Sequence, residues 1–109
     1  MTLSDIDVLP LDAKGYLLES RLWSPAFAEV MAARDELILT PDHWDVIDFL
    51  REYHERYALA PPMRLLVKEL GRQFGPDKAS SRYLYQLFPD GPARQACRYA
   101  GLPKPVSCI

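Results

Sequence analysis

Two cysteines are the side chains of this sequence best suited to covalent chemistry. Cys108 is the penultimate residue, and Cys97 lies eleven positions before it. Chain ends are usually exposed, whereas a free cysteine that only packs is usually buried. A thiolate can attack the sulfane sulfur of a donor and keep it as a persulfide. We therefore predict that Cys108 takes up a sulfur atom and delivers it to a second partner.

The residues around Cys108 predict an extended arm. Pro103 and Pro105 lack a backbone donor and favour a polyproline II conformation. Gly101 stands where a glycine would end the preceding helix. We expect a single globular domain over 1–101 and a flexible arm over 102–109 that carries the reactive cysteine. At ~3.1 Å per residue the arm would extend about 20 Å.

Cys97 has two interpretations. It falls in the middle of the last predicted helix, where a small thiol often packs in the core. It also lies close enough along the chain to act as a resolving thiol, which would meet Cys108 in a disulfide or a sulfur-bridged species. A disulfide requires Cα atoms within about 7 Å, a separation that a flexible arm can reach. The sequence leaves both interpretations open.

No other group of residues indicates a catalytic or metal site. The two cysteines and the two histidines, His43 and His54, match none of the usual zinc spacings. The histidines are expected to be ordinary helix residues. The sequence has no nucleophile elbow, no phosphate-binding glycine loop and no paired carboxylates that would support hydrolysis or phosphoryl transfer. We expect no metal, and no cofactor other than a covalent persulfide intermediate.

A short β-hairpin is predicted before the first helix. Ile6, Val8 and Leu11 precede a turn over 12–15, in which Gly15 can supply a positive φ, and apolar residues follow over 16–18. The apolar residues 37–39 are interpreted as a link between helices or as a third strand.

The rest of the chain is predicted to be helical. Serine or threonine followed by proline is a strong helix-start signal, and it occurs at Ser24-Pro25 and Thr40-Pro41. The predicted fold class is α+β and mostly helical: a small N-terminal β-hairpin or meander packed on an array of about five helices, with an extended mobile C-terminal arm. The predicted helices span 25–33, 41–57, 62–74, 80 or 81–87 and 92–101.

Composition favours a cytoplasmic protein. Apolar residues make up 49% of the 109 residues and charged residues 26%, which is typical of a globular protein. No apolar run reaches the ~18 residues of a membrane span, and the N-terminus lacks the features of a signal peptide. In the cytosol, paired cysteines are more often reactive groups than structural disulfides.

Charge is distributed unevenly along the sequence. Residues 1–60 hold 5 Lys/Arg against 12 Asp/Glu, and residues 61–109 hold 8 against 3, so that a net −7 precedes a net +5. This asymmetry indicates a basic surface on the C-terminal half that would meet an acidic protein or a nucleic acid. Neutralisation of one half by the other within the fold is the alternative.

Several segments resemble the DsrC/TusE family, and the resemblance covers nearly the whole chain. The tail from Gly91 to Ile109 resembles the ending of that family, and the stretch YLYQLFP at 83–89 resembles another of its motifs. Further similar segments are Lys14-Gly15-Tyr16-Leu17, His43-Trp44 and Phe49-Leu50-Arg51.

The resemblance implies sulfur-relay chemistry at Cys108 in one of two branches. TusE-like members accept sulfur from a TusBCD-like complex and pass it to the tRNA 2-thiouridylase, and so contact tRNA indirectly. DsrC-like members work with dissimilatory sulfite reductase and use two cysteines, here Cys97 and Cys108. Cys97 favours the second branch and the body of the chain favours the first, which we prefer. Either way the resemblance implies a sulfurtransferase-type carrier, and we expect no membrane partner. The implied docking or arm-guiding residues are Arg82, Tyr83, Arg94, Gln95, Arg98 and Lys104.

Two other classes of function remain as alternatives. The helices predicted over 62–74 and 80–88, with Gly75-Pro76 between them, could form a helix-turn-helix that places Arg72, Lys78 and Arg82 near phosphates. A purely structural subunit of a larger reductase is the other class. It predicts that function survives deletion of residues 102–109, whereas a carrier would lose its function.

Overall fold

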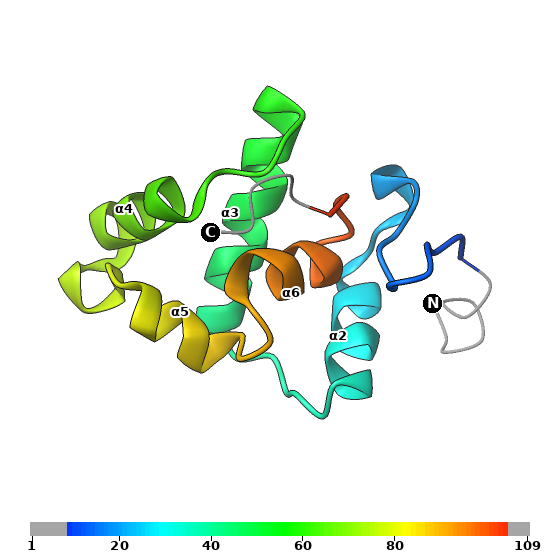
Figure 1. Cartoon of the computed structure of the whole chain (residues 1–109), viewed down its shortest axis with the longest axis horizontal. Coiled ribbons are helices and arrows are strands. Elements are labelled where there is room, and N and C mark those ends of the chain that lie inside the picture. The colour runs from blue at the N-terminus through cyan, green and yellow to red at the C-terminus, as the bar shows by residue number, and fades with distance from the viewer. Residues whose placement is uncertain (1–8, 105–109) are drawn as a thin grey trace.

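The computed structural model describes residues 9–104, and this part of the chain folds into five α-helices and two short 3-10 helices (Figure 1). The helices start near the predicted positions, and the last is two residues shorter than predicted. The 3-10 helices are η1 (Ser20–Leu22) and η2 (Pro76–Lys78). The α-helices are α2 (Pro25–Arg34), α3 (Pro41–Tyr57), α4 (Met63–Phe74), α5 (Ser81–Leu87) and α6 (Pro92–Tyr99).

Local capping explains why the helices start where they do. The Ser24 hydroxyl accepts a hydrogen bond from the Phe27 amide at 3.3 Å, and the Ser80 hydroxyl accepts one from the Tyr83 amide at 3.1 Å. A proline occupies the first turn of α2, α3 and α6, where its missing N–H costs nothing. These starts are therefore encoded in short stretches of sequence.

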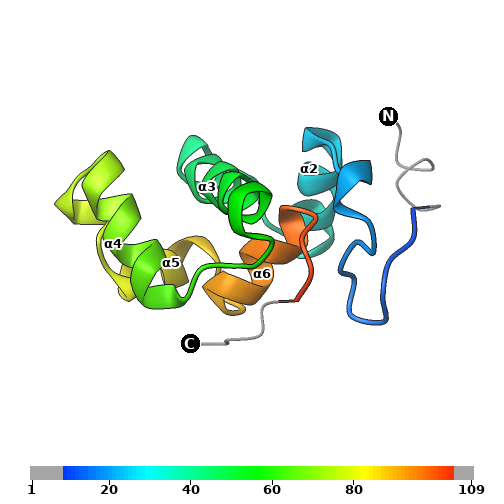
Figure 2. The same ribbon diagram turned by 90° about the horizontal axis from the view of Figure 1, so that it is seen from above.

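Helix α6 lies at the centre of the molecule. It contacts α2, α3 and α5, and Figures 1 and 2 show it between α2 on one side and α4 and α5 on the other. Ala96, Cys97, Tyr99 and Ala100 have no exposed surface. A helix of eight residues is marginal by itself in water, so the burial of this face among its neighbours must stabilise it.

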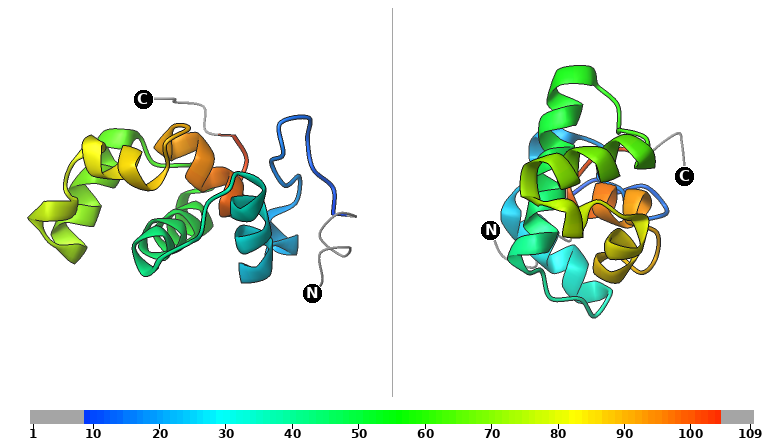
Figure 3. Two further views of the ribbon diagram at one scale, coloured as in Figure 1. Left: turned by 90° about the horizontal axis from the view of Figure 1, so that it is seen from below. Right: turned by 90° about the vertical axis from the view of Figure 1, so that its left-hand side faces the viewer.

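Helices α4 and α5 project from this centre as a pair joined by η2 (Figure 3). Leu66 and Leu70 of α4 and Leu84 of α5 are buried. Gly71 permits the close approach of the connection, because a Cβ at this position would lie 2.4 Å from the Cβ of Ala79.

The predicted α+β class is wrong, since the described residues contain no strand or sheet. The expected β-hairpin is reduced to a turn with one isolated antiparallel bridge between Leu11 and Leu17. The Asp12 carboxylate accepts hydrogen bonds from the amides of Lys14 and Tyr16, at 2.8 and 3.0 Å. This local turn chemistry competes with a ladder, and Tyr16 and Leu17 are buried in the core. Residues 6 and 8 of the expected first strand lie outside the described residues.

The third strand considered over 37–39 is absent as well. Helix α2 ends in a Schellman motif: Glu36 has a φ of 59°, and the Leu37 amide donates to the Ala32 carbonyl at 2.9 Å. The Leu37 amide is therefore used to end the helix and is not available for hydrogen bonding to a neighbouring β-strand. Ile38 follows with 86% of its surface exposed, so the segment is a linker.

None of the helices in the described part of the chain is long and apolar enough to span a membrane.

Candidate functional site

The site begins at the junction between α6 and the C-terminal segment, which is a Schellman motif. Gly101 adopts a φ of 70°. The Leu102 amide donates to the Cys97 carbonyl at 3.0 Å, and the Gly101 amide donates to the Arg98 carbonyl at 3.3 Å. Leu102 is only 2% exposed. The packed body therefore continues through Leu102, the first residue assigned to the arm, and Pro103 and Lys104 are exposed.

Two side chains from distant elements fix the same junction. The Trp23 indole donates to the Tyr99 carbonyl at 2.8 Å, and the Arg51 guanidinium donates to the Ala100 carbonyl at 2.7 Å. The guanidinium also lies 4.1 Å from the centre of the Trp23 ring, in a cation–π contact. These bonds satisfy carbonyls that a helix end leaves without intrahelical partners.

Trp23 also explains why position 101 is a glycine. A Cβ at Gly101 would lie 2.5 Å from Cδ1 and 2.8 Å from Cβ of Trp23. The direction in which the chain leaves α6 is thus determined by backbone conformation and by packing together.

Cys97 faces the core from the middle of α6. It has no exposed surface, and burial raises the pKa of its thiol to about 12. Only the thiolate is nucleophilic, so in this conformation Cys97 is protonated and inert near neutral pH. Cys108, the predicted sulfur carrier, lies outside the described residues.

A chain of hydrogen bonds holds the side chains of α6 in place. The Asp35 carboxylate accepts from the Tyr99 hydroxyl at 2.6 Å and pairs with Arg98. The Gln95 amide donates to the Tyr99 hydroxyl at 2.7 Å, and the Gln95 carbonyl oxygen accepts from the Asp90 amide at 2.8 Å. Burial, followed by the bond to Asp35, raises the pKa of Tyr99 to about 12. Tyr99 therefore stays a neutral donor at neutral pH.

A cationic cleft of about 410 Å³ opens beside the junction. Tyr16 and Gln95 form part of its wall, and Asp90 is its acidic lining residue. Burial, and then the neighbouring Cys97, raise the pKa of Tyr16, whose hydroxyl donates to the Arg94 carbonyl at 3.4 Å. The four basic residues that line the cleft are Lys14, Arg94, Arg98 and Lys104.

The structure separates the residues implied for docking into two groups. Arg94, Gln95, Arg98 and Lys104 all line the cationic cleft. Gln95 is 3% exposed and fully engaged in the network described above, which makes it part of the scaffold. Arg82 and Tyr83 lie on α5, away from this cleft: Arg82 is exposed and Tyr83 is half-buried.

Some residues of the site could not have been found from local sequence. Trp23, Arg51 and Asp35 form hydrogen bonds to α6 or to its C-terminal end across more than 45 residues of chain, and nothing in the neighbouring sequence indicates these bonds.

The role of His43 could not have been found from local sequence either. Its Nδ1 accepts from the Thr40 amide at 3.0 Å, and its Nε2 lies 2.8 Å from the Leu87 carbonyl oxygen. It joins the start of α3 to the end of α5.

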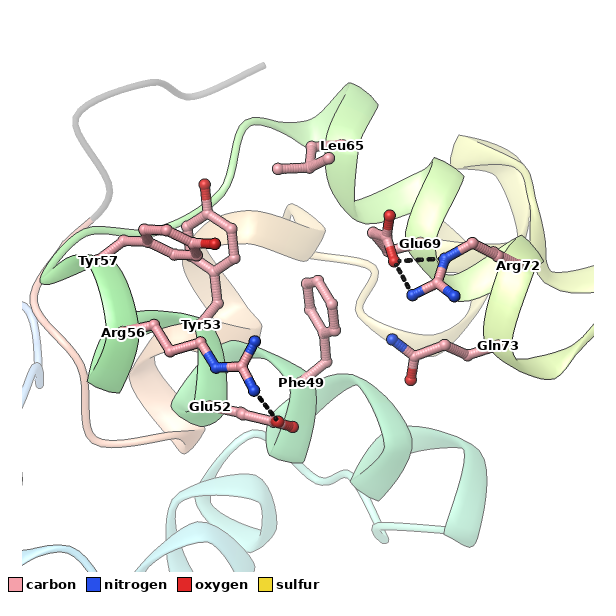
Figure 4. A pocket seen from close by; sticks show the side chains of 9 residues that line it. All are labelled: Phe49, Glu52, Tyr53, Arg56, Tyr57, Leu65, Glu69, Arg72 and Gln73. Atoms are coloured by element: carbon pink, nitrogen blue, oxygen red, sulfur yellow. Dashed lines mark hydrogen bonds and ion pairs between the residues drawn. The ribbon is translucent and has the colours of Figure 1, made fainter.

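A second groove lies between α3 and α4 (Figure 4). Phe49, Tyr53 and Tyr57 follow one another along α3, with ring centres 6.1 and 4.6 Å apart. The two arginines that line this groove each pair with a carboxylate of the same helix: Arg56 lies 3.5 Å from Glu52, and Arg72 lies 2.6 Å from Glu69. The groove is therefore aromatic and close to neutral.

Most of the basic side chains that a helix-turn-helix would use for phosphate binding already form ion pairs within the protein. Arg72 pairs with Glu69, and Lys78 lies 2.8 Å from Asp42 and 3.9 Å from Asp45. Two of the three side chains assigned to phosphate binding thus already have carboxylate partners. Among residues 9–104, no group of three or more His, Cys, Asp or Glu side chains is placed to hold a metal ion.

Comparison with known proteins gives matches over almost the whole chain. The family model described as "DsrC like protein" matches residues 5–109. Sulfurtransferase TusE of Pectobacterium atrosepticum is 49% identical over 98 residues, which cover 90% of each chain. Sulfurtransferase TusE of Photorhabdus laumondii is 50% identical over 98 residues, covering 90% of this chain and 88% of the relative.

Solved structures agree with these matches. The NMR structure of Allochromatium vinosum DsrC has a TM-score of 0.84 at 53% identity and covers 93% of this chain and 90% of that one. The crystal structure of the oxidized gamma-subunit of the dissimilatory sulfite reductase (DsrC) from Archaeoglobus fulgidus has a TM-score of 0.84 at 42% identity, with 93% and 92% covered. The resemblance carried by the tail and by the YLYQLFP stretch is confirmed: the chain belongs to the DsrC-like protein family.

Proposed function

We propose that this protein is a sulfur carrier of the TusE type, which accepts a persulfide sulfur on Cys108 and relays it towards the synthesis of 2-thiouridine at the tRNA wobble position. The observation that carries the proposal is the similarity to proteins named sulfurtransferase TusE at 49–50% identity over 90% of the chain. The penultimate cysteine supplies the chemistry. Its thiolate attacks the outer sulfur of a donor persulfide, the S–S bond of the donor breaks, the donor leaves as a thiolate, and Cys108 becomes the persulfide.

The state of Cys97 supports a carrier with a single reactive thiol. To resolve a persulfide on Cys108, Cys97 would have to attack as a thiolate and expel hydrosulfide. With a pKa of about 12 and no exposed surface, it is not prepared for that attack while α6 is packed as described. Its role in the closed body is to fill the core.

The partners proposed for this branch are a TusBCD-like donor complex and the tRNA 2-thiouridylase, in the cytoplasm. No resident cofactor is proposed, because the persulfide is the only group that the reaction requires. The exposed Arg82 on α5, together with Arg94 and Lys104 at the cleft, offers basic side chains for docking an acidic partner surface.

The alternative is a DsrC-type partner of dissimilatory sulfite reductase that uses Cys97 and Cys108 together. The similarity to solved DsrC structures at 42–53% identity favours it. This branch requires the core around Cys97 to open before the two sulfur atoms can meet.

Mass spectrometry after sulfur transfer tests the proposal. Reduced protein is incubated with a cysteine desulfurase, cysteine and a TusBCD-type complex, and the wild type is compared with Cys108→Ser and Cys97→Ala. We expect one added sulfur on the C-terminal peptide of the wild type and of Cys97→Ala, and none in Cys108→Ser. A sulfur-bridged Cys97–Cys108 peptide would favour the DsrC branch. Absence of added sulfur from every form, with a donor of proven activity, would refute the carrier function.

A further inference from the structure

The cationic cleft concentrates positive charge in an acidic protein. The whole chain carries a net charge of −2, yet four basic side chains line this one cleft against the single carboxylate of Asp90. Like charges gathered in one place repel each other, and a bound anion relieves that repulsion. The charge distribution in the cleft therefore favours binding of a negatively charged ligand.

Three of the four cations are available to such a ligand. Arg98 pairs with Asp35, whereas Lys14, Arg94 and Lys104 have no ion-pair partner among the described residues. All three are exposed. The nearby Asp12 carboxylate accepts hydrogen bonds from the amides of Lys14 and Tyr16; it keeps its negative charge but is not among the residues that line the cleft.

The three available cations come from separate segments. Lys14 lies in the turn before η1, Arg94 lies in the first turns of α6, and Lys104 follows the Schellman motif. The α6 network fixes one wall: Gln95 is held by Asp90 and Tyr99, and Arg98 by Asp35. A ligand in the cleft would therefore contact side chains from three separate segments of the chain.

We propose that this cleft binds a small tetrahedral oxoanion with two negative charges, of sulfur or of phosphorus. An arginine fork and two lysines match such a ligand, since the guanidinium binds two oxygen atoms at once and the ammonium groups act as point charges. The side chains that line the cleft are all polar or charged, which favours a hydrophilic anion over an apolar ligand. The proposal concerns the body of the protein and does not depend on sulfur transfer at Cys108.

NMR titration of the full-length Cys108→Ser protein tests this inference, because that variant separates anion binding from thiol chemistry. Sulfate, thiosulfate and phosphate are added separately at constant ionic strength, with chloride as the reference, and the backbone amides are followed. We expect saturable shifts around Lys14, Arg94 and Lys104 with at least one of the three anions. The relative affinities then distinguish a sulfur oxoanion from phosphate.

Substitution of single cations provides the matched control. Arg94→Gln and Lys104→Gln should each weaken binding about tenfold, the usual scale for losing one charge-assisted contact. Arg64→Gln removes an exposed arginine from α4, outside the cleft, and should leave the affinity unchanged. Shifts that do not saturate, or an equal loss in Arg64→Gln, would show only general attraction to a basic surface and would overturn the proposal. Failure of all three anions to bind would also overturn the proposal.

Discussion

Cys97 lies on the inner face of α6, and burial raises the pKa of its thiol to about 12. An unfolded chain has the ordinary value of about 9. Below pH 9 the thiol is protonated in both the folded and the unfolded chain, so the free energy of unfolding has its full value. Between pH 9 and 12 the unfolded chain loses its proton first, so the free energy of unfolding falls as the pH rises.

We therefore expect the wild type to lose about 1–2 kcal/mol more stability than Cys97→Ala when the pH is raised from about 8 to about 10.5. Denaturant titrations at the two pH values measure the difference. Tyr99, whose pKa is also raised to about 12, contributes equally to both proteins and cancels. Equal losses in the two proteins would mean that Cys97 is accessible to solvent.

Gly101 offers a test of the junction. Alanine at a left-handed position ordinarily costs about 1 kcal/mol, but here the new Cβ would also lie 2.5 Å from Cδ1 of Trp23. We expect Gly101→Ala to lower the free energy of unfolding by more than about 2 kcal/mol, measured by urea denaturation. A loss near 1 kcal/mol would show that Trp23 moves aside without cost.

Much of the helical fold could be predicted because its signals are local. Ser24-Pro25, Thr40-Pro41 and Ser80 mark helix starts within a few residues, and the structure places helices there. The hairpin prediction is wrong because alternation over 6–18 does not include the effect of the Asp12 side chain, which itself accepts hydrogen bonds from the turn amides. The partners of α6 could not be predicted at all, since Trp23, Arg51 and Asp35 reach it only through the tertiary fold.

His43 shows how two helices are joined by one buried side chain. It bonds Thr40 at the start of α3 and the Leu87 carbonyl at the end of α5, and its ring lies edge-on to Phe88, with ring centres 5.1 Å apart. Replacing it by alanine leaves the part-buried Leu87 carbonyl without this partner. His54, half-buried near the end of α3, forms no comparable side-chain bridge among residues 9–104.

We expect His43→Ala to lower the free energy of unfolding by about 2 kcal/mol, and His54→Ala to lower it by less than about 1 kcal/mol. Thermal and denaturant unfolding of the two variants gives the comparison. A similar cost for both would argue against the bridge between α3 and α5.

The molecule as a whole is built around α6, with α4, η2 and α5 as a less enclosed extension (Figures 1 and 3). Regions with fewer buried contacts open at a lower free energy than the core. Hydrogen exchange should therefore be slowest for the amides of Cys97, Tyr99 and Ala100 and faster by about tenfold or more along α4. Mass spectrometry with peptide-level resolution can measure this. Uniform protection across the helices would indicate that the chain opens only as one unit.

The Schellman junction has a consequence for transfer kinetics. Because Trp23 and Arg51 clamp the carbonyls of Tyr99 and Ala100, the chain leaves the body from a fixed point, and Cys108 follows Lys104 by only four residues. A partner that has already bound the body would meet this tethered thiol at an effective concentration in the millimolar range. If Cys108 carries the sulfur as proposed, docking and sulfur transfer become successive steps within one complex, and the affinity for the body sets how often transfer can occur.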